Sequence, residues 1–285
     1  MNLFESNNIK IEPNNLQVDI VLGDLIEIGE HRLLCDSSTD HFWRKATGFT
    51  SLCKEESVDL IVTSPPYNKK NWLRNKSKTN GWIREIEYSS YDDNLPQEEY
   101  VRWQKQVIAQ CLWALKPSGS LFYNHIDIMS KHLTIHPTWV YDFPLKQVII
   151  WDKCGTPKLD ESYFLPFTEW IFWIKKDKDL VPYFDRNSAL LKKNIWSIPR
   201  SQEANHPAPF PEKMVTNIVM SCSKPRDLVF DPYIGSGTTM VVAHQLNRKC
   251  YGIEIDPKYC QLIIHKMKKL DPSLQIKING NVYKK

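Results

Sequence analysis

The sequence lacks the features that mark membrane proteins, disulfide-rich proteins and metalloproteins. Over 285 residues no apolar run approaches the roughly 20 residues needed to cross a bilayer. The seven cysteines are scattered without a C-x-x-C pair, so neither a disulfide framework nor a zinc site is expected. The eight histidines form no cluster with ligand spacing, and we therefore predict no bound metal.

The amino terminus also lacks the basic and then apolar pattern of an export signal, so we expect a cytoplasmic protein. Hydrophobic residues make up 42% of the chain, which is enough for a folded core, and the length suits one large α/β domain. The formal net charge of +4 is modest: it is compatible with a polyanionic partner but does not prove one.

Two loops stand out, each directly after an apolar β-like run. Residues 58–62 are rich in β-branched side chains and lead into Thr63-Ser64-Pro65-Pro66-Tyr67, the Pro-Pro loop, where proline removes backbone donors and stops the strand. A second predicted strand, residues 228–231, leads into Asp231-Pro232-Tyr233-Ile234-Gly235-Ser236-Gly237-Thr238-Thr239, the glycine loop.

The glycine loop has the pattern of a nucleoside-binding turn. Gly235 and Gly237 let the backbone turn tightly and approach a ligand, while the helix predicted from Thr238 offers unpaired N–H groups. Glu254, seventeen positions after Gly237, ends the next predicted strand, where an acid in such folds accepts hydrogen bonds from ribose hydroxyls. No lysine follows Gly237, which disfavours a Walker ATP site.

The rest of the chain alternates strands and helices, which predicts an α/β fold with a parallel-rich sheet. Helices are expected over residues 96–115, 211–221, 238–246 and 257–270, and strands over residues 119–125, 147–151, 169–174 and 250–254. Periodicity is lost after residue 176, so we expect a small recognition insert over 183–205 between a catalytic half (18–182) and a cofactor half (206–277). Residues 1–16 and 278–285 are expected to be loosely held ends.

The order of the two loops, with Ser-Pro-Pro-Tyr far ahead of the glycine loop, resembles the permuted β-class of DNA amino-methyltransferases, which modify N4 of cytosine or N6 of adenine. The resemblance spans about residues 20–270. It implies a single domain with a circularly permuted Rossmann-like methyltransferase fold, a mixed and mostly parallel sheet, and helices on both faces. It also implies S-adenosyl-L-methionine as cofactor and double-stranded DNA as partner, and leaves open whether a cognate restriction endonuclease accompanies the enzyme.

The same resemblance assigns a set of cofactor-binding residues. They are Asp36 (adenine amino group), Phe210 (pocket wall, after His206-Pro207-Ala208-Pro209), Asp231 (methionine amino group), Tyr233 (in place of the usual phenylalanine), Gly235 and Gly237 (cofactor lining), Thr238 and Thr239 (methionine carboxylate) and Glu254 (ribose). Plain alternatives remain for two of these positions: Asp36 could cap a helix, and His206 could be an ordinary loop residue.

The Pro-Pro loop suits methylation of an exocyclic amine, which needs acceptors that hold the NH₂ group so that its lone pair attacks the sulfonium methyl in line. Ser64 Oγ and the Pro65 carbonyl can serve, because Pro65 and Pro66 hold the backbone extended. Tyr67 offers a face for stacking a flipped-out base, and flipping costs a few kcal/mol. Alternatively, the loop is a strand end with a packing tyrosine.

DNA contacts are expected from two basic, tryptophan-bearing segments, residues 68–86 and 183–203, because cations neutralise phosphate and aromatic rings can stack or wedge. The candidate residues are Lys69, Lys70, Arg74, Lys76, Lys78, Arg84, Lys192, Lys193 and Arg200. A charge run is otherwise a solvated face.

Ser-Pro-Pro-Tyr is typical of the N4-cytosine enzymes, whereas the N6-adenine enzymes more often have Asp or Asn in place of Ser64. Phe210-Pro211 in place of Lys-Pro leans the same way. We therefore predict N4-cytosine methylation, with N6-adenine as the alternative. More distant alternatives are methylation of protein glutamine or RNA, and a non-catalytic nucleic-acid-binding protein.

Overall fold

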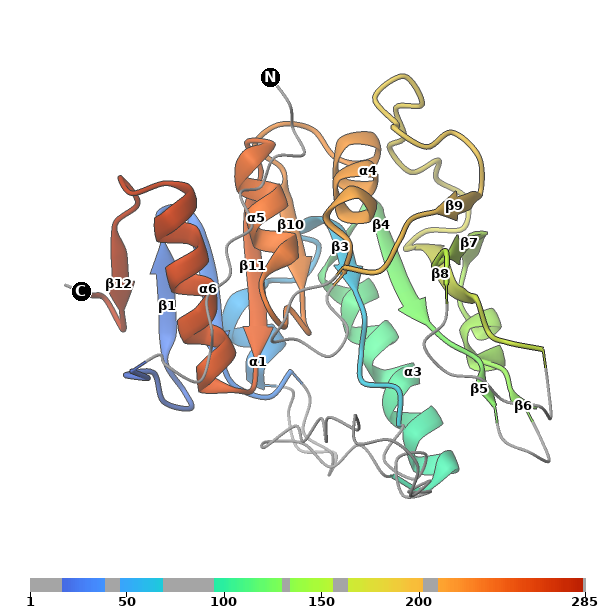
Figure 1. The fold of residues 1–285 in the computed structure, drawn as a ribbon, viewed down its shortest axis with the longest axis horizontal. Coiled ribbons are helices and arrows are strands. Elements are labelled where there is room, and N and C mark those ends of the chain that lie inside the picture. The colour runs from blue at the N-terminus through green and yellow to red at the C-terminus, as the bar shows by residue number, and fades with distance from the viewer. Residues whose placement is uncertain are drawn as a thin grey trace.

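The computed structural model describes residues 17–38, 47–68, 95–129, 134–155, 164–201 and 210–283. Within these residues the main sheet has 11 strands in the order β13-β12-β1-β2-β11-β10-β3-β4-β8-β7-β9 (Figure 1). These strands are β1 (Leu25–Ile28), β2 (His31–Cys35), β3 (Val58–Thr63), β4 (Leu115–His125), β7 (Leu145–Asp152), β8 (Thr168–Lys175), β9 (Ile195–Ser197), β10 (Leu228–Asp231), β11 (Lys249–Glu254), β12 (Ile276–Ile278) and β13 (Asn281–Val282). A separate two-stranded sheet joins β5 (Ile128–Met129) and β6 (Thr134–Ile135).

Helices cover both faces of the main sheet. Toward the viewer in Figure 1 lie α4 (Glu212–Cys222), α5 (Thr238–Gln245) and α6 (Pro257–Leu270), which bury one face. The other face is covered by α1 (Thr47–Leu52), α3 (Gln97–Ala114) and the 3₁₀ helix η2 (Thr138–Asp142). In β3, Leu60 and Val62 pack on the α4 side and Ile61 on the α3 side, which explains its nearly continuous apolar run.

The centre of the sheet contains a topological switch point. Strands β2, β11, β10, β3 and β4 run parallel, with β10 and β3 as neighbours. From β10 the chain passes through α5 to β11 on one side, whereas from β3 it passes through α3 to β4 on the other. Ligands of open α/β sheets bind outside the carboxyl ends of the strands at such a point. The Pro-Pro loop follows β3 and the glycine loop follows β10, so both lie there.

Most elements predicted from the periodicity are confirmed, among them α3, α4, α5, α6 and the strands β3, β7, β8, β10 and β11. The predicted loosely held carboxyl end is wrong for residues 278–283, because β12 and β13 pair with each other and β12 pairs with β1. β1 and β2 were not expected. Glu27 and Arg32 interrupt their apolar residues, so pairing with neighbouring strands rather than a continuous apolar run defines them.

The described part of the predicted insert does not form a separate lobe. β9 pairs with β7 in parallel, and Trp196 is buried against the main core. Trp151 Nε1 donates to the Ile198 carbonyl at 2.7 Å, which ties the segment to the sheet. The segment therefore extends the sheet by one edge strand. No helix in the described part of the chain is long and apolar enough to cross a membrane.

Candidate active site

The Pro-Pro loop and the glycine loop are joined directly by a hydrogen bond. Thr63 Oγ1 donates to Asp231 Oδ1 at 2.9 Å, across 168 positions of sequence. The bond follows from the register, because Phe230 pairs with Ile61 and both strands end together at the carboxyl edge. The two motifs recognised separately in the sequence therefore form one site.

Asp231 is the centre of this junction. Its Oδ1 also accepts from the Tyr233 backbone N–H at 3.1 Å, and its Oδ2 accepts from Thr239 Oγ1 at 2.7 Å. The side chain is only 1% exposed, and burial raises the pKa of its carboxyl group to about 6, although the three hydrogen bonds favour the charged form. The Thr239 hydroxyl is thus committed to Asp231, and any contact of Thr239 with a cofactor falls to its backbone N–H.

Glu254 lies at the next strand end, beside the glycine loop. Its Oε2 accepts from the Gly235 N–H at 3.0 Å and its Oε1 from the Asp256 N–H at 2.9 Å. Burial raises the pKa of Glu254 to about 7, and the nearby charges of Asp256 and Asp231 add to the rise. One strand further, Asp36 N–H donates to the Glu254 carbonyl at 3.0 Å, which brings Asp36 to the same edge.

The turn between β10 and α5 needs glycine for a steric reason. Gly237 has φ +86°, and a Cβ atom there would lie 2.7 Å from Ile263 Cγ1 of α6. Gly235 also has a left-handed backbone, with φ +54°. Thr238 begins α5, and Phe210 packs partly buried against the core just before α4.

The Pro-Pro loop is held at several points. Ser64 Oγ and Tyr67 OH are hydrogen-bonded at 2.5 Å. Tyr100 OH donates to the Pro66 carbonyl at 2.9 Å, which engages one lone pair of that oxygen. The Asn68 side-chain amide accepts from the Leu95 N–H at 2.7 Å and donates to the Leu95 carbonyl at 2.8 Å. These two bonds connect the far end of the loop to the residues just before α3.

Three residues near the Pro-Pro loop were not predicted. Asn124 Nδ2 donates to Tyr67 OH and, at 2.9 Å, to Glu169 Oε2, while Lys153 Nζ lies 3.4 Å from Glu169 Oε1. They come from the end of β4, the start of β8 and the residue after β7, which all meet at the carboxyl edge because β8 runs antiparallel to its neighbours. Polar residues at the ends of three apolar strands are the signal that could have indicated them.

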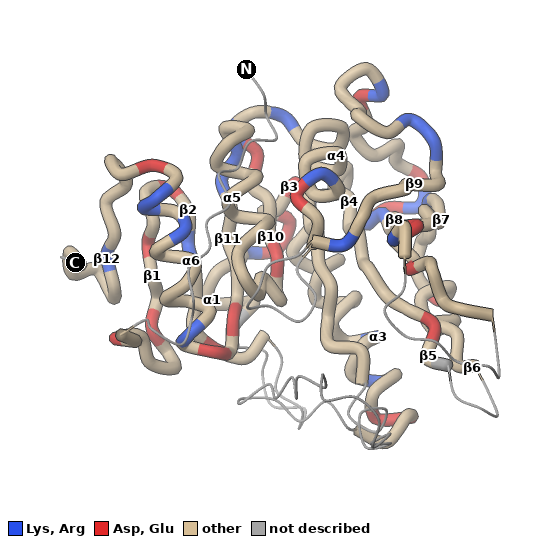
Figure 2. The backbone as a smooth tube through the Cα atoms, in the orientation of Figure 1, with Lys and Arg blue, Asp and Glu red and all other residues tan. Residues whose placement is uncertain are grey.

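Of the predicted DNA-contact residues, the structure describes only three, all of them exposed. The six from Lys69 to Arg84 lie outside the described residues. Ser197 is in register with Asp152 at the carboxyl edge, and Arg200 follows close enough to Lys153 to help lower the pKa of that lysine. Lys192 and Lys193 precede β9 and lie away from this edge. Along the described backbone, Lys and Arg are interspersed with Asp and Glu (Figure 2).

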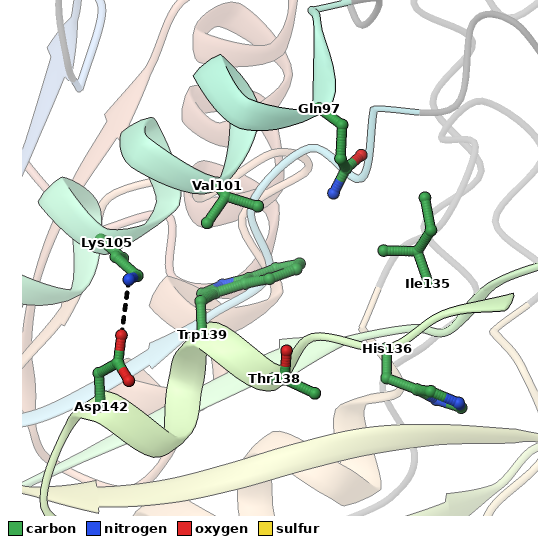
Figure 3. A pocket seen from close by; sticks show the side chains of 8 residues that line it. All are labelled: Gln97, Val101, Lys105, Ile135, His136, Thr138, Trp139 and Asp142. Carbon is green, nitrogen blue, oxygen red and sulfur yellow. Dashed lines mark ion pairs between the residues drawn. The ribbon is translucent and has the colours of Figure 1, made fainter.

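A separate pocket of about 360 Å³ lies between α3 and η2. Figure 3 shows Gln97 and Ile135 on opposite walls, with the Lys105–Asp142 ion pair at one end. The Trp139 ring in its wall contacts the rings of Tyr100 and His125, which lie behind the Pro-Pro loop. The pocket is therefore a neighbour of the loop junction and not part of it.

The strand order, the switch point and the two joined loops define a Rossmann-like methyltransferase fold, as predicted from the loop order. The chain belongs to the DNA methylase family, whose model matches residues 58–265. This confirms the predicted family. The family uses S-adenosyl-L-methionine, which agrees with the predicted cofactor.

Two curated relatives are similar over most of this chain. The type II methyltransferase M.BglII of Bacillus subtilis is 32% identical over 248 residues, which cover 73% of this chain and 63% of that protein. The chain thus spans less than two thirds of M.BglII. The DNA adenine methyltransferase YhdJ of Escherichia coli strain K12 is 26% identical over 250 residues, which cover 74% of this chain and 76% of YhdJ.

Two solved structures share the fold. The PvuII DNA methyltransferase, named cytosine-N4-specific, matches with a TM-score of 0.60 at 21% identity, over 86% of this chain and 94% of that one. TTHA0409 of Thermus thermophilus, solved with S-adenosyl-L-methionine bound, matches with a TM-score of 0.58 at 23% identity, over 79% and 90% of the two chains.

Proposed function

We propose that this protein transfers a methyl group from S-adenosyl-L-methionine to the exocyclic N4 of a cytosine flipped out of duplex DNA. The observation that carries the proposal is the Thr63–Asp231 hydrogen bond, which joins the loop suited to hold an amine to the loop suited to hold a nucleoside. Membership of the DNA methylase family supports the same conclusion.

The cofactor half of the site consists of strand ends in the order β2, β11, β10. The Glu254 carboxylate would accept hydrogen bonds from ribose hydroxyls, and Asp36, one strand further out, would accept from the adenine amino group. Gly235 and Gly237 let the backbone approach the cofactor, and the N–H groups at the start of α5 would hold its carboxylate. When bound, the cofactor supplies an electrophilic methyl group.

The target half begins at β3. Ser64 Oγ accepts one N–H of the target amine, and the Pro65 carbonyl accepts the other, which aligns the nitrogen lone pair with the methyl group. Tyr100 OH already donates to the Pro66 carbonyl, which engages one lone pair of that oxygen, so the Pro65 carbonyl is the one assigned to the amine. The Tyr67 ring stacks on the extruded base and offsets part of the flipping cost.

Cytosine N4 is proposed over adenine N6 because Ser64 stands where the adenine enzymes more often have Asp or Asn. The 26% identity to an adenine enzyme keeps N6 as the alternative. Incubation with labelled S-adenosyl-L-methionine and duplex DNA, followed by digestion to nucleosides, is expected to yield N4-methylcytosine. Recovery of labelled N6-methyladenine would contradict the choice of base. If no label were transferred to the DNA, the methyltransferase activity itself would be contradicted.

We propose that Arg200 and the basic segment from Lys69 to Arg84 contact DNA phosphates, because the segment directly follows the Pro-Pro loop in sequence and Arg200 lies near Lys153 at the same edge of the sheet. Lys192 and Lys193 remain candidates at the outer side of β9. The predicted insert over residues 183–205 is short, which supports a short recognition sequence, and sequencing of methylated DNA that revealed a long bipartite motif would count against it.

Cofactor affinity is expected to depend on the protonation of Glu254. Its pKa of about 7 means that acidification from pH 8 to pH 6 protonates it, and a protonated carboxyl loses acceptor capacity for ribose hydroxyls. The Kd for S-adenosyl-L-methionine should therefore rise by about tenfold over this range. Calorimetric titration at pH 6, 7 and 8 measures it.

The Glu254→Gln variant is the control. It should bind more weakly at pH 8 and show a nearly flat pH dependence, because the titrating group is gone while the side chain keeps its size. Protonation of the Asp231 carboxyl, whose pKa of about 6 is lower, contributes to the pH dependence of the Kd only near pH 6. Identical pH dependence in the variant and the natural protein would show that Glu254 does not bind the ribose.

A further inference from the structure

A chain of polar side chains leads from a buried ion pair to the Pro-Pro loop. Lys153 and Glu169 are 6% and 8% exposed, and Asn124 is 2% exposed. The ion pair of Lys153 and Glu169 continues through Asn124 to Tyr67 OH, which in turn bonds Ser64 Oγ. Five side chains from four different segments are thus connected without passing through the backbone.

The direction of the two Asn124 hydrogen bonds follows from chemistry. A carboxylate only accepts, so Glu169 requires that the Asn124 nitrogen, and not its oxygen, face it. The same Asn124 nitrogen then donates its second proton to Tyr67 OH. The Tyr67–Ser64 bond can run in either direction, since each hydroxyl can donate and accept. Ser64 keeps a lone pair for a further donor.

We propose that Glu169 and Lys153 are positioning residues for methyl transfer: they fix Asn124, which holds the Tyr67 hydroxyl beside Ser64 and so places the Ser64 oxygen as an acceptor for the target amine. This inference rests on the proposed function, since it concerns the same amine. Glu169 and Lys153 act through Asn124 and Tyr67 and do not touch the substrate.

The energetics of the pair support this role over a purely stabilising one. A buried ion pair costs desolvation that its attraction roughly repays, and apolar residues of similar size often stabilise a protein as well or better. Burial lowers the pKa of Lys153, and Glu169 opposes that shift, so the carboxylate favours the charged form of the lysine. A neutral pair would serve packing alone, whereas the carboxylate is needed to orient Asn124.

The test replaces both charges at once, so that no uncompensated charge is left in the interior. The double variant Lys153→Met, Glu169→Gln keeps the volumes and is expected to fold, but the amide introduced at position 169 no longer dictates the orientation of Asn124. We expect kcat for methyl transfer to fall about 10- to 100-fold, as small misplacements at a reacting centre do. The Kd for S-adenosyl-L-methionine should stay within about twofold, since only the target half is disturbed.

The matched control makes the same chemical change in another ion pair. Lys116 Nζ lies 2.6 Å from Asp59 Oδ1 near the opposite end of β3. The double variant Lys116→Met, Asp59→Asn should keep kcat. If the Lys153/Glu169 double variant keeps the natural kcat as well, the positioning role is overturned.

A single variant, Glu169→Asp, covers the case in which the double variant does not fold. It retains the charge opposite Lys153 but withdraws the carboxylate from Asn124 by one methylene, and kcat should again fall while cofactor affinity holds. Unchanged kcat in Glu169→Asp would overturn the inference. Absence of methyl transfer by the natural protein would instead refute the proposed function, so the two failures are distinguishable.

Discussion

The Tyr67→Ala variant is expected to lose about 100-fold or more in kcat for methyl transfer while its Kd for S-adenosyl-L-methionine changes little. Stacking of a base on an aromatic ring contributes about 1–3 kcal/mol, and the variant also loses the hydroxyl that bonds Ser64 and Asn124. Each 1.36 kcal/mol of barrier is about a tenfold change in rate. Cofactor affinity is spared because Tyr67 lies on the target side of the Thr63–Asp231 junction.

Single-turnover rates with duplex DNA and calorimetric titration with the cofactor would measure the two quantities separately. The Tyr67→Phe variant separates the ring from the hydroxyl: it should retain stacking and lose only the part of the rate that depends on orienting Ser64. A Tyr67→Ala protein that lost cofactor affinity and rate to the same degree would contradict this division between the two halves of the site.

The Asp231→Ala variant is expected to lose both stability and activity. It would leave Thr63 Oγ1, Thr239 Oγ1 and the Tyr233 N–H without their acceptor in a buried place, and each such loss costs about 1–3 kcal/mol. Removing the carboxylate also removes the cost of burying its charge, which offsets part of this loss, since the raised pKa of about 6 reflects that the interior disfavours the charge. We expect a net loss of about 3 kcal/mol in the free energy of unfolding.

Asp231→Asn is the informative comparison, because the amide oxygen still accepts from Thr63 and Tyr233, and the amide nitrogen can donate to Thr239 Oγ1, while the negative charge is gone. Denaturant unfolding should show it close to the natural protein in stability. Cofactor binding should still be weakened, because the proposed contact with the methionine amino group needs the charge. If Asp231→Asn bound the cofactor normally, Asp231 would be a structural clamp only.

Much of the fold was predictable from local patterns. The helix periodicities of α3 and α6 and the apolar runs of β3 and β10 each depend on burial of one or two faces, which a single segment records in its own sequence. β1, β2, β12 and β13 were missed because polar or charged residues interrupt them, so their neighbours define them. β12, for example, pairs with β1 at Ile276 and Ile28, positions almost 250 residues apart.

The sequence by itself determined the two loops, because their chemistry is local: prolines that end a strand and hold carbonyls in place, and glycines that tolerate a left-handed turn before a helix. Only the tertiary structure decided what surrounds them. Asn124, Glu169 and Lys153 reach the Pro-Pro loop through the order and direction of strands β4, β8 and β7. The same holds for the bond between Thr63 and Asp231, since strand pairing joins residues whose separation along the chain leaves no local pattern.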